Sequence, residues 1–319
     1  MAEELKEVRE KKGRGSYLNK LTRISPGWNL VLLIFLLILA VIVIVPVALV
    51  VVVSLSTAES IALNGYSFLP SEWTLIAYEN LLGKGLGTQI LQSYIVTIAM
   101  TAVGTVLSLF LMSLYAYVLA QRNFPAKRFY TLILFFTMLF SGGLVPSYIV
   151  NRQYLHLYDN FWVLVLPGLI AAYNVFILRT FMQSTIPEAM FDAARIDGAS
   201  DFRIYWQIVL PLCKAGLAVV AMWAIVGRWN DWFTGMLYIE NAKLVPLQTM
   251  LQKIQNNIDF IKNNSQMKNS VEGASILKSL PGESTRMAIV VISTVPIIFA
   301  YPFFQRYFIQ GITVGSVKG

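Results

Sequence analysis

Few side chains in this sequence could take part in catalysis. The chain of 319 residues contains one histidine, His156, and one cysteine, Cys213. These two residues cannot build a Cys/His zinc site, and a Ser/His/Asp triad would depend on His156 alone. The phosphate-binding sequence Gly-x-x-x-x-Gly-Lys-Ser/Thr does not occur. We therefore expect that this chain is not an enzyme and that it binds no metal or cofactor of its own.

Another set of chemically capable residues lies inside an otherwise apolar run. Arg228 and Asp231 are the only charges well inside such a run, and ionisable groups in membrane segments are functional candidates. They stand three residues apart on one helix face, so they could neutralise each other near the outer rim of a membrane. The alternative is a gate or substrate contact formed with Asn230. Trp229 and Trp232 beside them could line that contact or lie at the membrane interface.

A third candidate is a docking element between Ile186 and Pro211. Pro187 suits the first turn of a helix, where its missing N–H is no loss, and Glu188 complements the positive helix end. Gly198 can adopt the left-handed conformation that ends a helix. The pattern predicts a capped helix of about ten residues, followed by a bend and a second helix that leads to Pro211.

The elements that carry these residues are apolar runs long enough to cross a bilayer. The composition is 56% hydrophobic and only 13% charged, whereas soluble domains carry roughly 25% charged residues. Six runs approach the roughly 20 residues that a span requires. They cover about residues 30–53, 94–120, 129–151, 160–178, 214–239 and 287–305. Residues 28–310 are thus predicted to form one six-helix membrane domain between cytoplasmic tails at 1–27 and 311–319.

The distribution of Lys and Arg orients these spans. Seven basic residues precede the first run and only Lys84 follows it, and the later loops continue this alternation. Because basic residues favour the cytoplasmic side, both termini and the loop 179–212 are predicted to be cytoplasmic. The loop 240–286 is then external, although it carries six basic residues. Apolar residues at helical spacing predict an amphipathic helix at its start.

The docking element resembles the cytoplasmic signature of permease subunits in binding-protein-dependent ABC importers. That signature is Glu-Ala-Ala, three residues, Gly, nine residues, Ile, one residue and Leu-Pro. This chain has Asp192 where the family usually has Glu. It matches the other positions, at the same spacing, with Ala193, Ala194, Gly198, Ile208, Leu210 and Pro211.

Further segments resemble the carbohydrate branch of that family, in particular the maltose-type second permease. They are the residues around Asp197-Gly198-Ala199, the cluster at Trp229-Asn230-Asp231 and the ending from Gln305 onward. The segment 140–146 is similar to the subgroup that handles complex or oligomeric saccharides. The resemblance covers most of the chain from the second run onward.

The resemblance implies an all-α integral protein of the cell membrane with the type I ABC importer permease fold, six transmembrane helices and a cytoplasmic coupling helix. It implies a heterodimer with a second permease, two ATPase subunits that hold ATP and Mg, an extracellular solute-binding protein, a sugar substrate and surrounding membrane lipid, but no nucleic acid. By this resemblance, the residues of the coupling loop would be Glu188, Asp192, Ala193, Ala194, Asp197, Gly198, Ile208, Leu210 and Pro211. The residues of the pathway or gate would be Arg228, Trp229, Asn230, Asp231 and Trp232. A contact of the C-terminal tail would involve Gly311, Gly315 and Lys318.

Two other functions remain open from the sequence. The chain could be an ABC importer permease for a non-sugar solute such as a peptide or amino acid. A stand-alone secondary transporter is less favoured, because the sequence has no array of intramembrane carboxylates and no evident inverted repeat.

The predicted topology can be tested by cysteine labelling in a Cys213→Ser background. An impermeant thiol reagent added outside the cells should modify Asn64→Cys and Asn263→Cys, because both positions are expected to be external. It should not modify Gly13→Cys until the membrane is permeabilised. Labelling of Gly13→Cys in intact cells would contradict the orientation.

Overall fold

A computed structural model describes residues 25–83, 86–263 and 282–315. These residues are almost entirely helical. The only strand-like feature within the described ranges is an isolated antiparallel bridge between Ser56 and Trp73. The described part of the chain therefore has the all-α architecture expected from the sequence.

The α-helices are α2 (Pro26–Ser54), α3 (Ala58–Asn64), α4 (Ile76–Leu82), α5 (Leu86–Ala120), α6 (Lys127–Leu139), α7 (Leu144–Ile149), α8 (Ala172–Thr185), α9 (Glu188–Ile196), α10 (Asp201–Ile204), α11 (Leu210–Leu212), α12 (Lys214–Trp229), α13 (Phe233–Tyr238), α14 (Leu247–Asn263) and α17 (Glu283–Gly315). Two π-helical segments are η1 (Val150–Tyr154) and η3 (Tyr205–Val209), and two 3-10 segments are η2 (Phe161–Leu164) and η4 (Ala242–Leu244).

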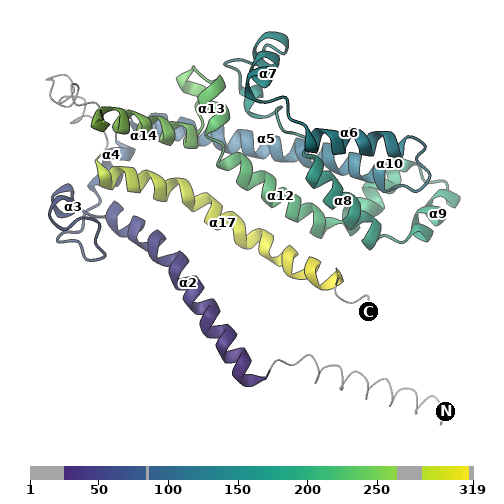
Figure 1. The fold of residues 1–319 in the computed structure, drawn as a ribbon, viewed down its shortest axis with the longest axis horizontal. Coiled ribbons are helices and arrows are strands. Elements are labelled where there is room, and N and C mark those ends of the chain that lie inside the picture. Colours follow the sequence, from purple (N-terminus) through teal and green to yellow (C-terminus); the bar gives the residue numbers. More distant parts are fainter. Residues whose placement is uncertain (1–24, 84–85, 264–281, 316–319) are drawn as a thin grey trace.

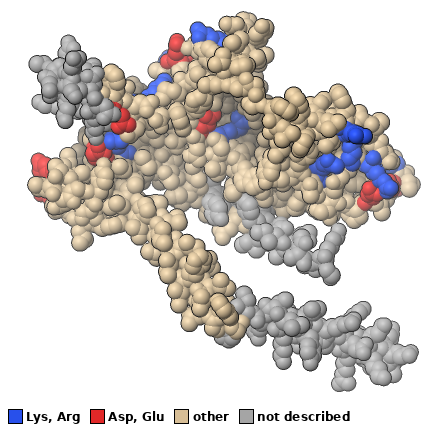
Figure 2. Space-filling view, in the orientation of Figure 1, with Lys and Arg blue, Asp and Glu red and all other residues tan. Residues whose placement is uncertain are grey.

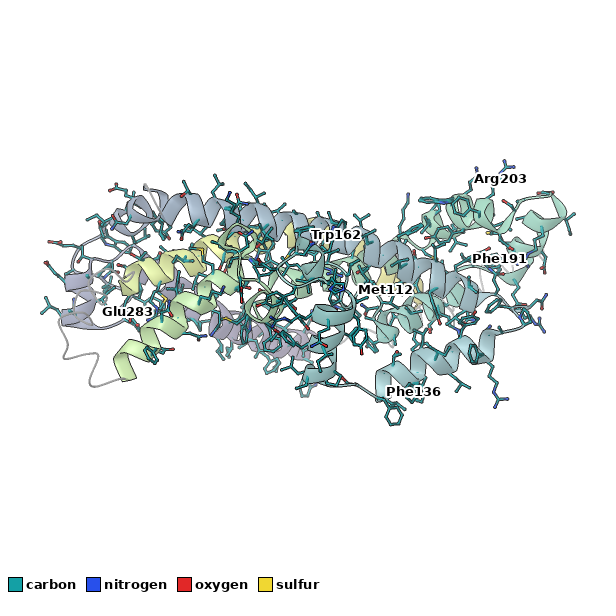
Figure 3. The ribbon with its side chains drawn as sticks, turned by 90° about the horizontal axis from the view of Figure 1, so that it is seen from above. Met112, Phe136, Trp162, Phe191, Arg203 and Glu283 are labelled. Carbon is teal, nitrogen blue, oxygen red and sulfur yellow. The ribbon has the colours of Figure 1, made fainter. Side chains whose placement is uncertain are left out.

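Three helices, α5, α12 and α17, run lengthwise through the molecule and contact one another through α12 (Figure 1). The short helices α9 and α10 lie at one end, and α3, α4 and α14 lie at the other. Seen from above, Phe191 and Arg203 mark the first end and Glu283 the opposite one, with Met112 and Trp162 between them (Figure 3). α14 is the amphipathic helix that the sequence predicted at residue 247 and beyond.

The first helix, α2, stands apart from the bundle over most of its length (Figure 1). Its 29 residues extend over about 43 Å at 1.5 Å per residue. Every large apolar side chain from Trp28 to Val47 is at least 42% exposed. An apolar surface of this size is stable only against lipid or another protein.

Three of the predicted spans are not continuous helices. The run 129–151 bends by 112° between α6 and the α7–η1 segment. The run 160–178 contains only η2 and the start of α8, and the run 214–239 is divided between α12 and α13. Hydropathy detects apolar composition but not these breaks, where Gly143 and Gly168 have positive φ and Pro167 cannot donate a backbone hydrogen bond.

Within the described residues, two helices are each long and apolar enough to cross a membrane, one in α2 and one in α5. The number rises to four if each of two bent helix pairs counts as one span. The second bent pair joins α10–α11 to α12 at an angle of 80°. The six-span count therefore stays a prediction.

On the face shown in Figure 2, the charged side chains cluster in a few regions and leave most of the surface uncharged. Figure 2 shows Lys, Arg, Asp and Glu gathered over the α9–α10 end and near α3, α14 and α7. The surface between these regions is largely uncharged, apart from a small group of opposite charges in a central hollow. This division matches a protein with a hydrocarbon-facing belt.

The segment 311–319, predicted to be a cytoplasmic tail, lies partly within the described residues. α17 continues as a helix through Gly311 to Gly315, so the tail does not begin as an irregular segment at residue 311. Lys318, the remaining residue expected in a tail contact, lies outside the described residues.

Candidate functional site

The short helix α9 lies where its sequence predicts, except that Pro187 is the extended N-cap residue and not part of the first turn. It runs from Glu188 to Ile196, and Gly198 after it has a φ of +78°. The Gly198 N–H donates to the carbonyl of Arg195 at 3.0 Å, and the Ala199 N–H donates to the carbonyl of Ala194 at 2.9 Å. These two bonds form a Schellman motif, which requires the left-handed conformation that glycine adopts without strain. The expected helix-ending role of Gly198 is confirmed.

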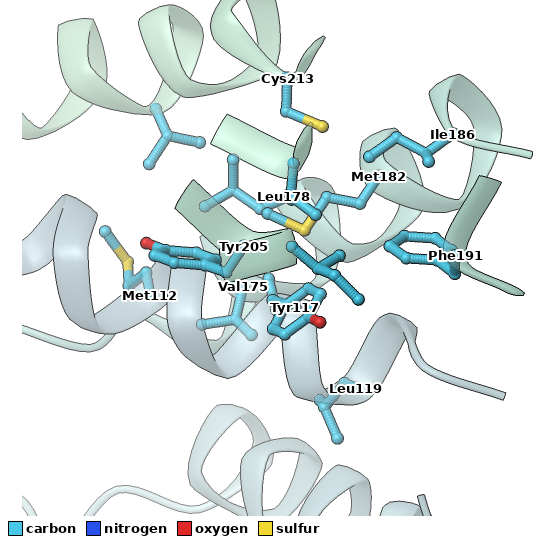
Figure 4. Packing of buried hydrophobic residues seen from close by; sticks show 14 of the residues in the cluster. Met112, Tyr117, Leu119, Val175, Leu178, Met182, Ile186, Phe191, Tyr205 and Cys213 are labelled. Atoms are coloured by element: carbon cyan, nitrogen blue, oxygen red, sulfur yellow. The ribbon is translucent and has the colours of Figure 1, made fainter. Parts of the chain in front are cut away.

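One face of α9 is anchored in the largest hydrophobic cluster (Figure 4). Phe191 is 9% exposed, and its ring centroid lies 6.4 Å from that of Tyr117 on α5. Ala194 and Ala199 pack against the same cluster. Burial of a phenylalanine side chain contributes roughly 1.5–3 kcal/mol, so this contact fixes α9 on the bundle.

Polar contacts join the same helix to the end of α5. Arg122 forms an ion pair with Glu188 at 3.0 Å. Arg195 donates to Gln121 Oε1 at 2.8 Å and lies 3.5 Å from Asp201 Oδ1. All these side chains are at the surface, where such pairs contribute about 0–1 kcal/mol each. They set the orientation of α9, whereas Phe191 supplies most of the attachment.

The opposite face of α9 is free in the described structure. Ala189, Ala193 and Ile196 follow one another at helical spacing and are exposed, and Ile196 is 86% exposed. Asp192 and Asp197 are also exposed; the Asp192 carboxylate lies 3.9 Å from Arg195 Nη1. α9 is thus a two-faced helix, with an anchored side and an apolar outer side flanked by carboxylates.

The rest of the signature connects α9 to the bundle. Ile208 and Leu210 are partly buried against the same hydrophobic cluster, and Pro211 is exposed in α11. The π-helical turn η3 directly precedes Leu210. Pro211 lacks the N–H of a regular α-helical bond, and a π turn accommodates this missing donor. The chain then bends by 80° into α12.

The second candidate region surrounds Arg228 at the end of α12. Arg228 Nη1 donates to the backbone carbonyls of Leu164 and Val165 at 3.4 and 3.2 Å. Its Nη2 donates to Ser108 Oγ on α5 at 2.8 Å. The guanidinium lies so close to α5 that a Cβ added at Gly104 would be 2.6 Å from Arg228 Nε. Arg228 therefore satisfies the carbonyls at the end of η2.

Asp231 has a separate structural partner. Its Oδ1 accepts a hydrogen bond from the Thr234 N–H at 3.0 Å and so caps α13. No ion pair within 4.0 Å joins Asp231 to Arg228 among the described contacts. Arg228 and Asp231 thus bond to different partners at adjoining helix breaks, while the Asp231 charge still attracts the Arg228 guanidinium.

The two tryptophans of this region differ. Trp229 is 5% exposed and donates from Nε1 to the Ser293 carbonyl at 3.0 Å. Trp232 is 41% exposed and lines a separate cavity of about 270 Å³ between α14 and α17. The side chain of Asn230 donates back to Val226 at 3.0 Å. The structure therefore does not gather these three side chains around one ligand position.

A cavity of about 370 Å³ instead lies beside Arg228 and Asp231, where the breaks before α8 and after α12 adjoin. Its lining also includes Ser108, Asn174 and Trp223. Sequence reasoning missed Ser108 and Trp223, because an apolar run gives no sign of which face lines a cavity. The adjacent Tyr173-Asn174 pair in an apolar run was the one available signal.

Comparisons with known proteins identify the family. Residues 110–314 match the family described as "Binding-protein-dependent transport system inner membrane component". The sequence is 34% identical over 266 residues to the polygalacturonan/rhamnogalacturonan transport system permease protein YtcP of Bacillus subtilis, covering 83% of this chain and 89% of YtcP. It is 36% identical over 267 residues to protein LplC of the same organism, covering 83% and 86%.

A solved structure supports the same assignment. A chain of a bacterial ABC transporter involved in import of the acidic polysaccharide alginate superimposes with a TM-score of 0.75 at 29% identity. The match covers 90% of this chain and 99% of the other. The family match extends over more than half of the sequence and includes both α9 and the helix breaks. The chain therefore belongs to the binding-protein-dependent transport system inner membrane components and is a permease subunit of an ABC importer, not an enzyme.

Proposed function

We propose that this chain pairs with a second permease to form a path through the cell membrane for an oligosaccharide. The observation that carries the coupling role is the two-faced helix α9, anchored through Phe191 and exposed at Ile196. The names of two relatives, a polygalacturonan/rhamnogalacturonan permease and an alginate importer, support a saccharide as the cargo.

The outer face of α9 is the contact for an ATPase subunit. Ala189, Ala193 and Ile196 fit an apolar cleft, and Asp192 and Asp197 can accept hydrogen bonds at its rim. ATP and Mg are held by two ATPase subunits outside this chain. Closure of the ATPase dimer moves α9, and α9 carries that displacement into the bundle because its inner face is packed on α5 and η3.

In this proposal the α9 end is cytoplasmic and the α3–α14 end is external. The start of α2 and the end of α17 both lie toward the α9 side in Figure 1, which supports two cytoplasmic termini. An extracellular binding protein would deliver the saccharide at the α3–α14 end. The cavity beside Arg228 and Asp231 then lies along the path. These two side chains hold the cavity wall in place, because they bond to backbone groups at the helix breaks.

The proposed function is tested by assembly and substrate stimulation. Co-expression with the second permease, the ATPase and the binding protein of the same system should yield a complex with two ATPase copies. In proteoliposomes, binding protein loaded with trigalacturonate or an alginate trisaccharide should stimulate ATP hydrolysis, whereas an unloaded binding protein should stimulate it less. A homogeneous, transport-active complex without an ATPase would refute the importer proposal. ATP hydrolysis that is stimulated only by peptides or amino acids would refute the proposal that the cargo is a saccharide.

The coupling role of α9 predicts the effects of two substitutions. Gly198→Asp places a side chain at φ +78°, which costs about 1–2 kcal/mol and disrupts the surface that meets the ATPase. Asp192→Lys reverses a charge at the same surface. Each should reduce saccharide-stimulated ATP hydrolysis and uptake at least tenfold while membrane abundance is kept. Asp192→Glu, the usual residue of the family, should be tolerated.

Gly65→Asp is the matched control for Gly198→Asp. Gly65 has a φ of +64° and open space around it, but it follows α3 at the opposite end of the molecule. With a ψ of −155°, Gly65 adopts a conformation open almost only to glycine. The substitution therefore imposes at least as much strain as Gly198→Asp without touching the proposed ATPase contact, and membrane abundance and assembly with the ATPase should persist. Full stimulated activity in both Gly198→Asp and Asp192→Lys would show that α9 does not transmit ATPase closure.

The C-terminal residues are proposed to contact the ATPase dimer from the cytoplasmic side. Gly311 and Gly315 lie near the end of α17, and small residues allow close approach. Deletion of residues 314–319, which removes Lys318, should change the rate or regulation of ATP hydrolysis while the complex still assembles. Equal hydrolysis with and without these residues, across saccharide concentrations, would remove this contact from the proposal.

A further inference from the structure

We propose that the cavity beside Arg228 is a subsite for one pyranose ring of the transported saccharide, with the indole of Trp223 as its stacking surface. This inference rests on the proposed function, since it places the sugar contact on this chain and not only on the second permease. At about 370 Å³, the cavity falls within the usual range of roughly 300–1,000 Å³ for small-molecule sites.

An aromatic platform forms one wall. Trp223 on α12 lines the cavity and is 41% exposed. Tyr173 on α8 stacks with it, with ring centroids 6.1 Å apart and an angle of 24° between the planes. This pairing holds the indole in a fixed orientation between two helices. The flat face of an aromatic ring suits the C–H face of a pyranose, and its apolar character tolerates sugars of different stereochemistry.

Polar groups on other parts of the wall are available for hydroxyl groups. Asn174 lines the cavity, and its side chain has no hydrogen bond among the described contacts. Asp231 also lines it and uses only Oδ1 for the Thr234 N–H, although a carboxylate can accept about four hydrogen bonds. An amide and a carboxylate together supply the donors and acceptors that sugar hydroxyls need.

Arg228 and Ser108 have a different role in this wall. Arg228 is bonded to Ser108, Leu164 and Val165, so it fixes the frame to which the subsite belongs. Irregular backbone at membrane depth is tolerated where it is buried in protein or lines a cavity. The non-helical segment between η2 and α8, with Pro167 and Gly168 in the cavity wall, fits that rule.

The neighbouring tryptophans do not provide this platform. Trp229 is buried and bonded to the Ser293 carbonyl, and Trp232 lines the separate cavity between α14 and α17. Trp223 is therefore the tryptophan of α12 that lines the cavity beside Arg228 and is exposed there.

The test uses the intact complex in proteoliposomes, with saturating binding protein loaded with whichever of trigalacturonate and an alginate trisaccharide, both built of pyranose rings, stimulates the wild type. Trp223→Leu keeps apolar bulk but removes the ring face, so saccharide taken up per ATP hydrolysed should fall about tenfold, the factor equivalent to 1.4 kcal/mol. Trp223→Phe retains a ring and should stay within about threefold of wild type. Trp28→Leu, an exposed tryptophan on α2 far from the cavity, should match wild type.

Three results would overturn the subsite. The first is unchanged uptake per ATP hydrolysed in Trp223→Leu. The second is a loss of uptake per ATP in Trp223→Phe that equals the loss in Trp223→Leu. The third is loss of the second permease from the purified Trp223→Leu complex, which would show that Trp223 is needed for assembly. A wild-type complex that responds to neither trisaccharide would instead refute the proposed function. That outcome is distinct, because it appears before any substitution is made.

Discussion

A backbone carbonyl in the apolar middle of a bilayer must find a donor within the protein, because no water is present to supply one. Three of the apolar runs of this chain are interrupted, so each break leaves backbone groups that need partners. Arg228 supplies two donors to the carbonyls at the end of η2, and Asp231 supplies an acceptor to the first turn of α13. The charges that look exceptional in the sequence are the groups that make the irregular backbone possible.

This arrangement also explains why the cavity is polar although the chain around it is apolar. Asn174 lines this cavity from the first turn of α8, which directly follows the break between η2 and α8. The bonds of Arg228 to Ser108 on α5 and to the carbonyls after η2 tie three elements together. The cavity wall is thus a rigid frame, and any change in its shape requires those elements to move relative to one another.

The sequence was most informative where structure is local. The limits of α9 follow from Pro187 and Gly198, because capping depends on residues within one turn of the helix end. The partners of Arg228 could not be predicted, since Leu164 and Ser108 come from elements far away in the chain. The same limit applies to tryptophans. Trp223 and Trp229 lie on one helix, α12. Because this helix has apolar residues on every side, the spacing of its apolar residues cannot reveal which face lines a cavity.

α9 and the cavity are joined by two helices. α8 has 14 residues, about 21 Å, and runs from Ala172, two residues before Asn174, to Thr185, three residues before α9 begins. α12 returns from the bend after Pro211 to Arg228 over 16 residues, about 24 Å. Both helices pack on α5 through the cluster that also holds Phe191. Close-packed helices shift as units and do not deform continuously. In the proposed function, a displacement of α9 would therefore change the cavity by tilting α8 and α12 against α5. The Arg228 contacts are the point where such tilting must be accommodated, because they are the only described side-chain bonds that link α12 to both α5 and the η2 segment.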